Sequence, residues 1–245
     1  MVIGLKGCGL WVIDKYGLFI RINFKLGYLV YRKNGGFMRN NDFQDIVFNR
    51  HSIKSFDASY KIPREEMLEI LQEATQAPSS VNLQPWRFVV VESDEGKEKL
   101  RPLVKFNTRQ NDTSSAMILI FGDMKCYEKA DEIYSEAVRR GVMPQEIKER
   151  AMGFFLPAYK SFSRQKMNDV VKIDSSLMAM QLQFVARAHG YDTNVIGGFE
   201  EDIIAEKFGL DPERYVPVMI IAIGKADYEY HESVRLDVKD ISKFV

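Results

Sequence analysis

A run of nine residues, Pro78-Ser79-Ser80-Val81-Asn82-Leu83-Gln84-Pro85-Trp86, separates two regular elements of the chain. Its two prolines and its small polar residues favour turns, so we expect a loop. Before it, Pro63 suits the first turn of a helix, and apolar residues recur at helical spacing up to Pro78. After it, the apolar run Phe88–Val91 predicts a buried strand. The loop therefore joins a helix to a strand of the core.

Further apolar runs and helical patterns follow along the chain. Met117–Phe121 and Val216–Ile223 predict buried strands, and Asp192–Ile196 predicts a shorter one. Helical patterns occupy residues 41–48, 128–140, 144–159 and 201–208. Helices around at least three buried strands indicate an α/β or α+β fold.

One more helix has an unusual pattern. Asp174 or Ser175 can cap its start, and it runs to His189, where Gly190 ends it. Its apolar residues lie on all sides: Leu177, Met178, Met180, Leu182, Phe184, Val185 and Ala188. A helix that is apolar on every face is buried on every face. In a chain of 245 residues, we expect a partner subunit to cover part of it.

Composition excludes several classes of protein. The chain is 46 % hydrophobic and 28 % charged, which is typical of one globular domain. Its 34 basic residues balance 34 acidic ones, whereas a nucleic-acid-binding domain is usually strongly basic. Two cysteines, Cys8 and Cys126, and three histidines are too few for a disulfide framework or a metal site. We therefore expect a cytoplasmic protein that binds neither metal nor nucleic acid.

The first 37 residues differ from the remainder, so we divide the chain into an extension, 1–37, and one domain, 38–245. The extension carries six basic residues and one acid, Asp14, which gives it a net charge of +5. Charges interrupt its apolar stretch Leu10–Tyr31, whereas a membrane span needs about 20 mostly uncharged residues. No signal-peptide cleavage site follows it. We expect no membrane association from this segment.

Two alternatives remain for the extension. The alternation of apolar and polar residues in Leu18–Tyr31 suits a β-hairpin. The second alternative is a misassigned start, with Met38 as the natural first residue. Asn34-Gly35-Gly36-Phe37-Met38 can be back-translated as a purine-rich run shortly before an ATG, which is how a bacterial ribosome-binding site looks when it is translated.

Several common catalytic motifs are absent from the sequence. No G-x-G-x-x-G follows a strand, and the sequence has neither a G-x-x-x-x-G-K-[ST] phosphate loop nor a G-x-S-x-G nucleophile elbow. The carboxylates are dispersed, so no glycosidase pair can be named. Polar loops are the remaining candidates for a site.

Two loops qualify. In an extended chain, Arg50, Ser52 and Lys54 point to one side, where two cations and a hydroxyl can hold a phosphate. The alternative is a solvated basic patch whose charges pair with the nearby Asp57. The loop 78–86 can line a polar, uncharged heterocycle, or it is an ordinary turn.

Together these residues resemble the nitroreductase family of FMN-dependent oxidoreductases. The resemblance covers residues 40–245 and is carried by Arg50-His51-Ser52-x-Lys54-x-Phe56, by Pro78-Ser79-Ser80-x-Asn82-x-Gln84-Pro85-Trp86, by Ile196-Gly197-Gly198-Phe199 and by Arg235. It implies an α+β fold, a nitroreductase-like α/β sandwich with a mostly antiparallel sheet flanked by helices. It also implies an interlocked homodimer with two FMN sites at the subunit interface.

The resemblance assigns a role to each matching residue. Arg50 and Arg235 would bind the FMN phosphate with help from Ser52, His51 would offer main-chain contacts, and Lys54 would face the pyrimidine edge of the flavin. From the other subunit, these residues would pack over the ring: Pro78, Ser79, Ser80 and Asn82. The ring edge would be held by Asn107, with Gln110 or Asn111, and by backbone N–H groups of Gly197 and Gly198.

The chain departs from the family pattern at two places. Many relatives have Glu-Gly where this chain has Gly197-Gly198, and a proline at Val195. A Lys-x-Arg pair near the C-terminus is here Ser233-x-Arg235, so one phosphate cation is missing. The departures bear on FMN affinity and leave the expected identity of the cofactor unchanged.

The implied activity needs no catalytic side chain, because the flavin carries the chemistry. NAD(P)H would reduce the flavin at N5 and leave, and a nitroaromatic, quinone or free flavin would then take its place in a ping-pong cycle. Lys54 would give electrostatic support. The alternatives are a flavin-binding or storage module without turnover, and a non-reductase member of the same fold, such as an oxidase or dehalogenase.

Overall fold

The computed structural model describes residues 2–5, 10–13, 19–22, 39–228, 230 and 232–245. The chain divides into two compact units, Met1–Met38 and Arg39–Val245. In the first unit, β1 (Val2–Leu5), β2 (Leu10–Ile13) and β3 (Phe19–Ile22) form an antiparallel sheet in that order. β3 lies in the stretch where a hairpin is expected and pairs with β2, whereas residues 23–31 of that stretch lie outside the described residues.

The described part of the second unit contains a four-stranded antiparallel sheet. Its strands are β4 (Trp86–Val91), β5 (Ala116–Asp123), β6 (Asp192–Ile196) and β7 (Tyr215–Gly224), in the order β4-β5-β7-β6. Every residue of β5 is buried, because helices cover both faces of the sheet. The α+β class expected from the sequence is confirmed.

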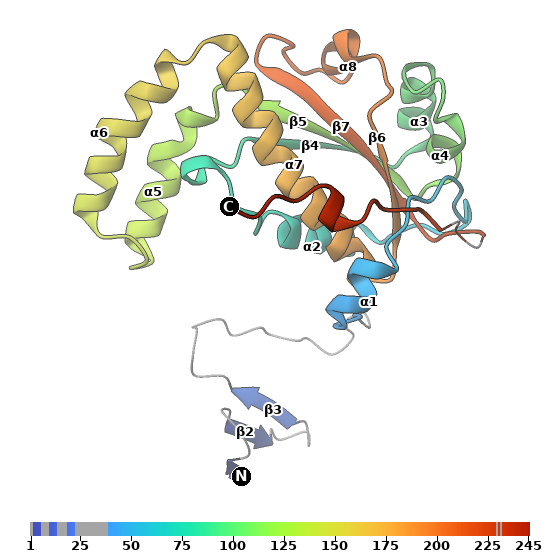
Figure 1. The fold of residues 1–245 in the computed structure, drawn as a ribbon, viewed down its shortest axis with the longest axis horizontal. Helices are drawn as coiled ribbons and strands as arrows, with labels where there is room; N and C mark the ends of the chain where they lie inside the picture. The colour runs from blue at the N-terminus through green and yellow to red at the C-terminus, as the bar shows by residue number, and fades with distance from the viewer. Residues whose placement is uncertain (1, 6–9, 14–18, 23–38, 229, 231) are drawn as a thin grey trace. The chain divides into compact units, whose positions relative to one another are not determined.

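Helices account for most of the remaining chain. They are α1 (Phe43–Phe48), α2 (Arg64–Ala74), α3 (Asp94–Leu100), α4 (Thr108–Thr113), α5 (Ala130–Arg139), α6 (Gln145–Ser161), α7 (Arg164–Ala188) and α8 (Glu201–Lys207). Short 3₁₀ turns cover Ser80–Asn82, Arg101–Leu103, Cys126–Lys129 and Val238–Asp240. α5 and α6 form a pair that projects from one side of α7 (Figure 1).

The alternation of β5 explains how one strand serves two cores. Ile118 and Ile120 pack toward α2 and α7, where Leu182 is fully buried. Leu119 and Phe121 point to the opposite face, toward the side of the sheet that α3 and α8 cover. Because side chains alternate along a strand, an unbroken apolar run supplies both layers.

α7 begins ten residues before the expected cap. Ser163 caps it by accepting a hydrogen bond from Lys166 N at 3.2 Å. The first turns bury only a stripe, with Met167 and Val171 inside, so they lack the all-round apolar pattern that marks residues 175–189. The expected start at Asp174 or Ser175 was therefore wrong, and Asp174 lies in the middle of the helix.

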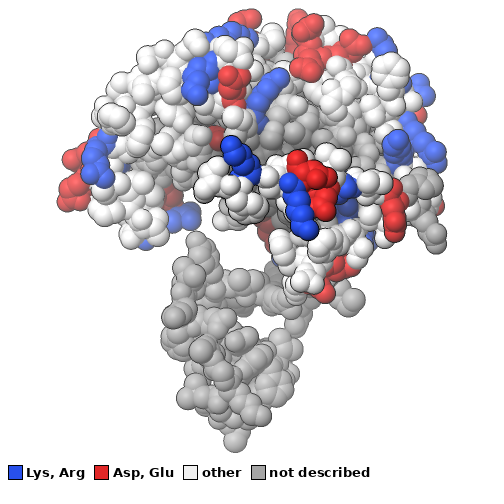
Figure 2. Space-filling model, in the orientation of Figure 1, with Lys and Arg blue, Asp and Glu red and all other residues white. Residues whose placement is uncertain are grey.

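Basic and acidic side chains both occur on the visible surface. Figure 2 shows them interspersed on one face of the molecule. Among the described residues, no helix is both long enough and apolar enough to cross a bilayer.

We expect a chain that begins at Met38 to fold and function like the full-length chain. The hydrophobic clusters of the second unit use residues from Ile53 onward, and the proposed site begins at Arg50. About 200 residues suffice for a core of this kind. Equal melting temperature, FMN content and NAD(P)H oxidation in the truncated and full-length proteins would support this expectation. A colourless or unfolded truncation would contradict it.

Candidate functional site

The segment that contains Arg50, Ser52 and Lys54 extends the edge of the sheet. Ser52 pairs with Thr193 in β6, and Ile53 N donates to Thr193 O at 3.0 Å. Ile53 is buried, whereas Ser52 and Lys54 are exposed. Ser52 and Lys54 follow the alternation that the sequence predicts and turn away from the core, whereas Arg50 is half-buried.

Arg235 is close enough to Arg50 for its positive charge to act on the Arg50 guanidinium. The pKa of Arg50 is lowered, first by burial and second by the positive charge of Arg235. Arg235 donates to Ser233 Oγ at 2.8 Å and to Val234 O at 2.9 Å, both in its own segment. Within the described ranges, no carboxylate lies within 4.0 Å of the charged groups of Arg50, Lys54 or Arg235. Two arginines that lie near each other with no carboxylate in ion-pair distance favour a bound anion.

Asp57 does not form an ion pair with these cations. Its carboxylate accepts hydrogen bonds from the Ser59 backbone N–H at 2.9 Å and from Ser59 Oγ at 2.5 Å. These hydrogen bonds lower the pKa of Asp57. The alternative of a basic patch paired with Asp57 therefore finds no support in the geometry.

His51 adds an unpartnered polar atom to this group. Its ring stacks on Tyr230 with centroids 3.5 Å apart, and its Nε2 is buried without a hydrogen-bond partner among the described residues. Burial lowers the pKa of His51, and the charges of Arg50 and Arg187 lower it further. His51 is therefore neutral at pH 7, and a ligand at this place can satisfy its Nε2.

Gly197 and Gly198 follow the end of β6 and leave their backbone open to a ligand. A Cβ on Gly197 would meet nothing within 4 Å, and one on Gly198 would only approach Asn107 Nδ2 at 4.0 Å. Asn107 donates to Gly198 O at 3.3 Å and accepts from Gln110 Nε2 at 3.1 Å. Both amides thus lie at the sheet edge that the Arg50 segment extends.

The structure therefore brings most predicted site residues together on one edge of the molecule. We call this set the sheet-edge group: Arg50, His51, Ser52, Lys54, Asn107, Gln110, Gly197, Gly198 and Arg235. Its members are connected through β6, through the start of α4 and through the charge of Arg235 on Arg50.

The other predicted site residues lie in the loop 78–84, which forms a second, separate group. They are Pro78, Ser79, Ser80 and Asn82. The Tyr134 hydroxyl of α5 donates to Val81 O at 2.7 Å, which attaches this loop to the α5–α6 side of the subunit. Figure 1 shows α5 and α4 on opposite sides of α7. Within one chain, the loop 78–84 and the sheet-edge group are therefore apart from each other. Trp86, which follows the loop, is a core residue and only 5 % exposed.

The backbone of this loop is unusual. Val81, Asn82 and Gln84 have φ angles of 44°, 56° and 47°, in the left-handed region. Asparagine visits that region readily, but a β-branched residue such as valine is a real outlier there. Such conformations persist only where their surroundings enforce them, and they cluster at functional sites.

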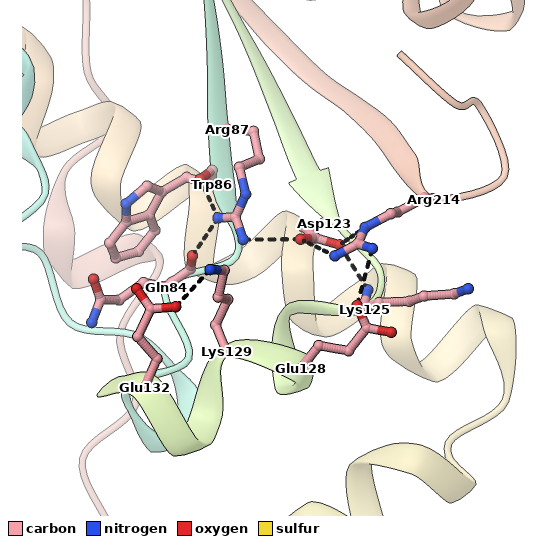
Figure 3. A network of polar contacts seen from close by, with 9 residues as sticks. All are labelled: Gln84, Trp86, Arg87, Asp123, Lys125, Glu128, Lys129, Glu132 and Arg214. Carbon is pink, nitrogen blue, oxygen red and sulfur yellow. Dashed lines mark hydrogen bonds and ion pairs between the residues drawn. The ribbon is translucent and has the colours of Figure 1, made fainter. Parts of the chain in front are cut away.

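A buried carboxylate holds the far end of the loop through an arginine (Figure 3). Arg87 donates from Nη1 to Gln84 O at 2.9 Å and from Nη2 to Asp123 Oδ2 at 2.9 Å. Arg214 donates two more hydrogen bonds to the Asp123 carboxylate, at 2.9 and 3.0 Å, and its Nη1 lies 3.0 Å from Glu128 Oε2. The bonds to Asp123 raise the pKa of Arg214. Asp123 is fully buried, and both Arg87 and Arg214 donate to it.

Sequence reasoning missed several residues that shape these groups. Tyr230 stacks on His51, Asp174 and Arg87 hold the loop, and Phe106, beside Asn107, is 93 % exposed. For Phe106 the sequence holds a signal, because a single aromatic residue between the polar residues Lys105 and Asn107 can indicate an exposed side chain. The others are distant in sequence from what they contact. Within the described part of the chain, no cluster of His, Cys, Asp and Glu could hold a metal.

Comparison with known proteins gives a consistent result. A Bacillus subtilis protein named "Putative NAD(P)H nitroreductase YdgI" is 51 % identical over 207 residues, which covers 84 % of this chain and 99 % of that protein. The "CLA biosynthesis enone reductase" of Lactiplantibacillus plantarum is 42 % identical and covers 84 % and 95 % of the two chains.

Solved structures agree. A "putative nitroreductase in complex with FMN" from Exiguobacterium sibiricum is 50 % identical, covers 86 % of this chain and 100 % of that one, and superposes with a TM-score of 0.83. The profile of the nitroreductase family matches residues 47–225, which contain both groups described above except for Arg235. The chain belongs to the nitroreductase family.

Proposed function

We propose that this protein is an FMN-dependent oxidoreductase that takes a hydride from NAD(P)H and passes electrons to nitroaromatic, quinone or flavin acceptors. The observation that carries the proposal is the pair Arg50 and Arg235, which lie near each other with no described carboxylate within 4.0 Å of either guanidinium group. The names of the relatives support the donor, and the Exiguobacterium relative was solved with FMN.

The sheet-edge group fits an FMN molecule by the chemistry of its donors. Arg50 and Arg235 would hold the phosphate, with Ser52 as a further donor. Lys54 would face the pyrimidine edge, and its exposed ammonium would stabilise negative charge there. The unpartnered His51 Nε2 and the open backbone at Gly197 and Gly198 offer the remaining contacts.

When bound, FMN supplies hydride transfer in both half-reactions. The protein's residues bind and orient the reactants, since the chain has no nicotinamide-binding motif of its own. Lys54 and Gly198 are exposed, so water can reach this edge and deliver protons. Phe106, exposed beside Asn107, offers an aromatic surface on which a planar donor or acceptor would stack in turn.

A homodimer would complete the site. Because the sheet-edge group lies on the α4 side of α7 and the loop 78–84 on the α5 side, a second copy would bring its loop to the first copy's sheet edge. Unpartnered apolar side chains are available for such an interface. On α7, Ile173 is 62 % and Leu177 is 48 % exposed, and the C-terminal segment exposes Val234, Leu236, Ile241 and Phe244.

We expect the protein to be a dimer at micromolar concentration. Light scattering of the purified protein would measure the mass, and Leu177→Glu would place a charge on the exposed stripe of α7 and lower the dimer fraction. The exposed Glu95→Lys on α3 is the control for a change of charge. A monomer that remains yellow and active would refute the composite site.

Anaerobic titration tests the activity. The purified protein should be yellow, release FMN on denaturation and lose its flavin absorbance when NADH or NADPH is added without oxygen. Addition of a quinone, a nitroaromatic or, following the Lactiplantibacillus relative, an enone should then restore the colour. A stable colour with both nucleotides would instead identify a storage module, and reduction that no such acceptor reverses would point to a non-reductase member of the fold.

A further inference from the structure

The loop 78–84 is held in its left-handed conformation by residues outside it. Asp174 of α7 accepts two hydrogen bonds from Ser80, from the backbone N–H at 2.9 Å and from Oγ at 3.0 Å. Asp174 is 3 % exposed and lies 94 positions from its partner. These bonds fix the residue directly before Val81, whose φ of 44° is costly for a β-branched side chain.

A second hold acts at the other end of the loop. Arg87 donates to Gln84 O at 2.9 Å, and Asp123 fixes the guanidinium of Arg87 at 2.9 Å. Gln84 also has a left-handed backbone, and its N–H donates to Ser79 Oγ at 3.0 Å. The strained residues thus lie between two buried carboxylates, each of which acts through hydrogen bonds on the loop.

We propose that Asp174 and the Arg87–Asp123 pair are positioning residues that hold the loop 79–84 in the conformation that contacts the flavin. The proposal deepens the proposed function, because it assumes that this loop packs over FMN in the dimer. Neither Asp174 nor Asp123 would touch the cofactor. Asp174 acts through its two hydrogen bonds to Ser80, and Asp123 acts through Arg87, to enforce a backbone that the loop sequence by itself disfavours.

Asp174→Ala should release the loop, and Asp174→Asn should keep it. The asparagine Oδ1 can accept from Ser80 N, and its Nδ2 can donate to Ser80 Oγ, so both contacts survive. Burial raises the pKa of Asp174, so removal of the charge should not harm the fold. We expect the FMN Kd to rise about tenfold or more in Asp174→Ala and to stay within about threefold in Asp174→Asn.

A comparison of glycine and alanine at position 81 distinguishes the effect of backbone strain on FMN affinity from the effect of lost side-chain packing. In the Asp174→Ala background, Val81→Gly removes the penalty for positive φ, whereas Val81→Ala removes the same packing but keeps a Cβ. We expect Val81→Gly to recover most of the FMN affinity and Val81→Ala to recover none. The visible circular dichroism of the bound flavin should return with glycine as well.

Hydrogen exchange of the loop gives a readout that needs no flavin. The Ser80 N–H should exchange faster in Asp174→Ala than in wild type or in Asp174→Asn, with the rest of α7 unchanged. If the wild type binds no FMN but the exchange of Ser80 N–H still differs between the variants in this way, the proposed function is wrong. The role of Asp174 in positioning the loop is then still supported.

Three results would overturn the proposal. They are unchanged exchange in Asp174→Ala, equal loss of affinity in the asparagine and alanine variants, and equal recovery by glycine and alanine at position 81. If Asp174→Ala does not fold, Arg87→Ala with Gln84→Gly or Gln84→Ala repeats the same comparison at the other end. There too, recovery by glycine alone would support the proposal, and equal behaviour of the two would refute it.

Discussion

Replacement of Arg50 or Arg235 by alanine should weaken FMN binding by about 10- to 150-fold each, since a hydrogen bond to a charged group contributes about 1.5–3 kcal/mol. Burial lowers the pKa of Arg50, and repulsion by the positive charge of Arg235 lowers it further. A phosphate between them relieves that repulsion, so each arginine contributes to the same anion. Fluorescence titration of the apoprotein with FMN would measure both constants.

A matched control is available on the surface. Arg164 is 58 % exposed and pairs with Glu213 at 3.2 Å, outside both groups. Arg164→Ala should leave the FMN Kd unchanged, because exposed ion pairs contribute little. Wild-type affinity in both site variants would refute the phosphate assignment. Copurification of FAD in place of FMN would refute it as well, because the dinucleotide has a different phosphate environment.

Local patterns predicted much of the sheet edge. Alternation in residues 52–54 gave the correct outward face, and the apolar runs gave the strands β4, β5, β6 and β7. The strands carry strong periodic signals because both faces of the sheet are covered. The short helix α3 was missed, although Ser93 followed by two acids is a start signal, and Ser93 Oγ does cap it at 3.1 Å.

The conformation of the loop could not be predicted by the same means. Pro78 and Pro85 identify a loop, but no local rule places Val81 at positive φ, because the intrinsic preference of valine opposes it. The conformation depends on Asp174 and Arg87, whose contacts are set by the packing of α7 and β4. Residues under tertiary constraint are where sequence reasoning is expected to fail, and they often mark functional sites.

A buried polar network between α2 and the residues that follow α7 depends on tertiary packing in the same way. Glu66 on α2 has a fully buried side chain, with Oε1 3.0 Å from His189 Nδ1 and Oε2 2.6 Å from the Tyr191 hydroxyl. Burial and the bond to Glu66 raise the pKa of Tyr191, so its hydroxyl stays a donor. Tyr60 continues the network, with its hydroxyl 3.0 Å from that of Tyr191.

Glu66→Ala should therefore destabilise the protein by about 3–5 kcal/mol, because it removes the buried carboxylate that both His189 Nδ1 and the Tyr191 hydroxyl contact and leaves a cavity in the core. For a domain of this size, that loss corresponds to a melting temperature lower by roughly 10 °C. Glu65→Ala is the matched control: Glu65 is the preceding residue of α2 and exposed, so its loss should cost less than about 1 kcal/mol. Glu66→Gln keeps an acceptor for Tyr191 and should fall between the two. Urea unfolding and thermal melts of the three variants measure these differences. Equal stability of the Glu66→Ala and Glu65→Ala proteins would show that the network contributes nothing to the fold.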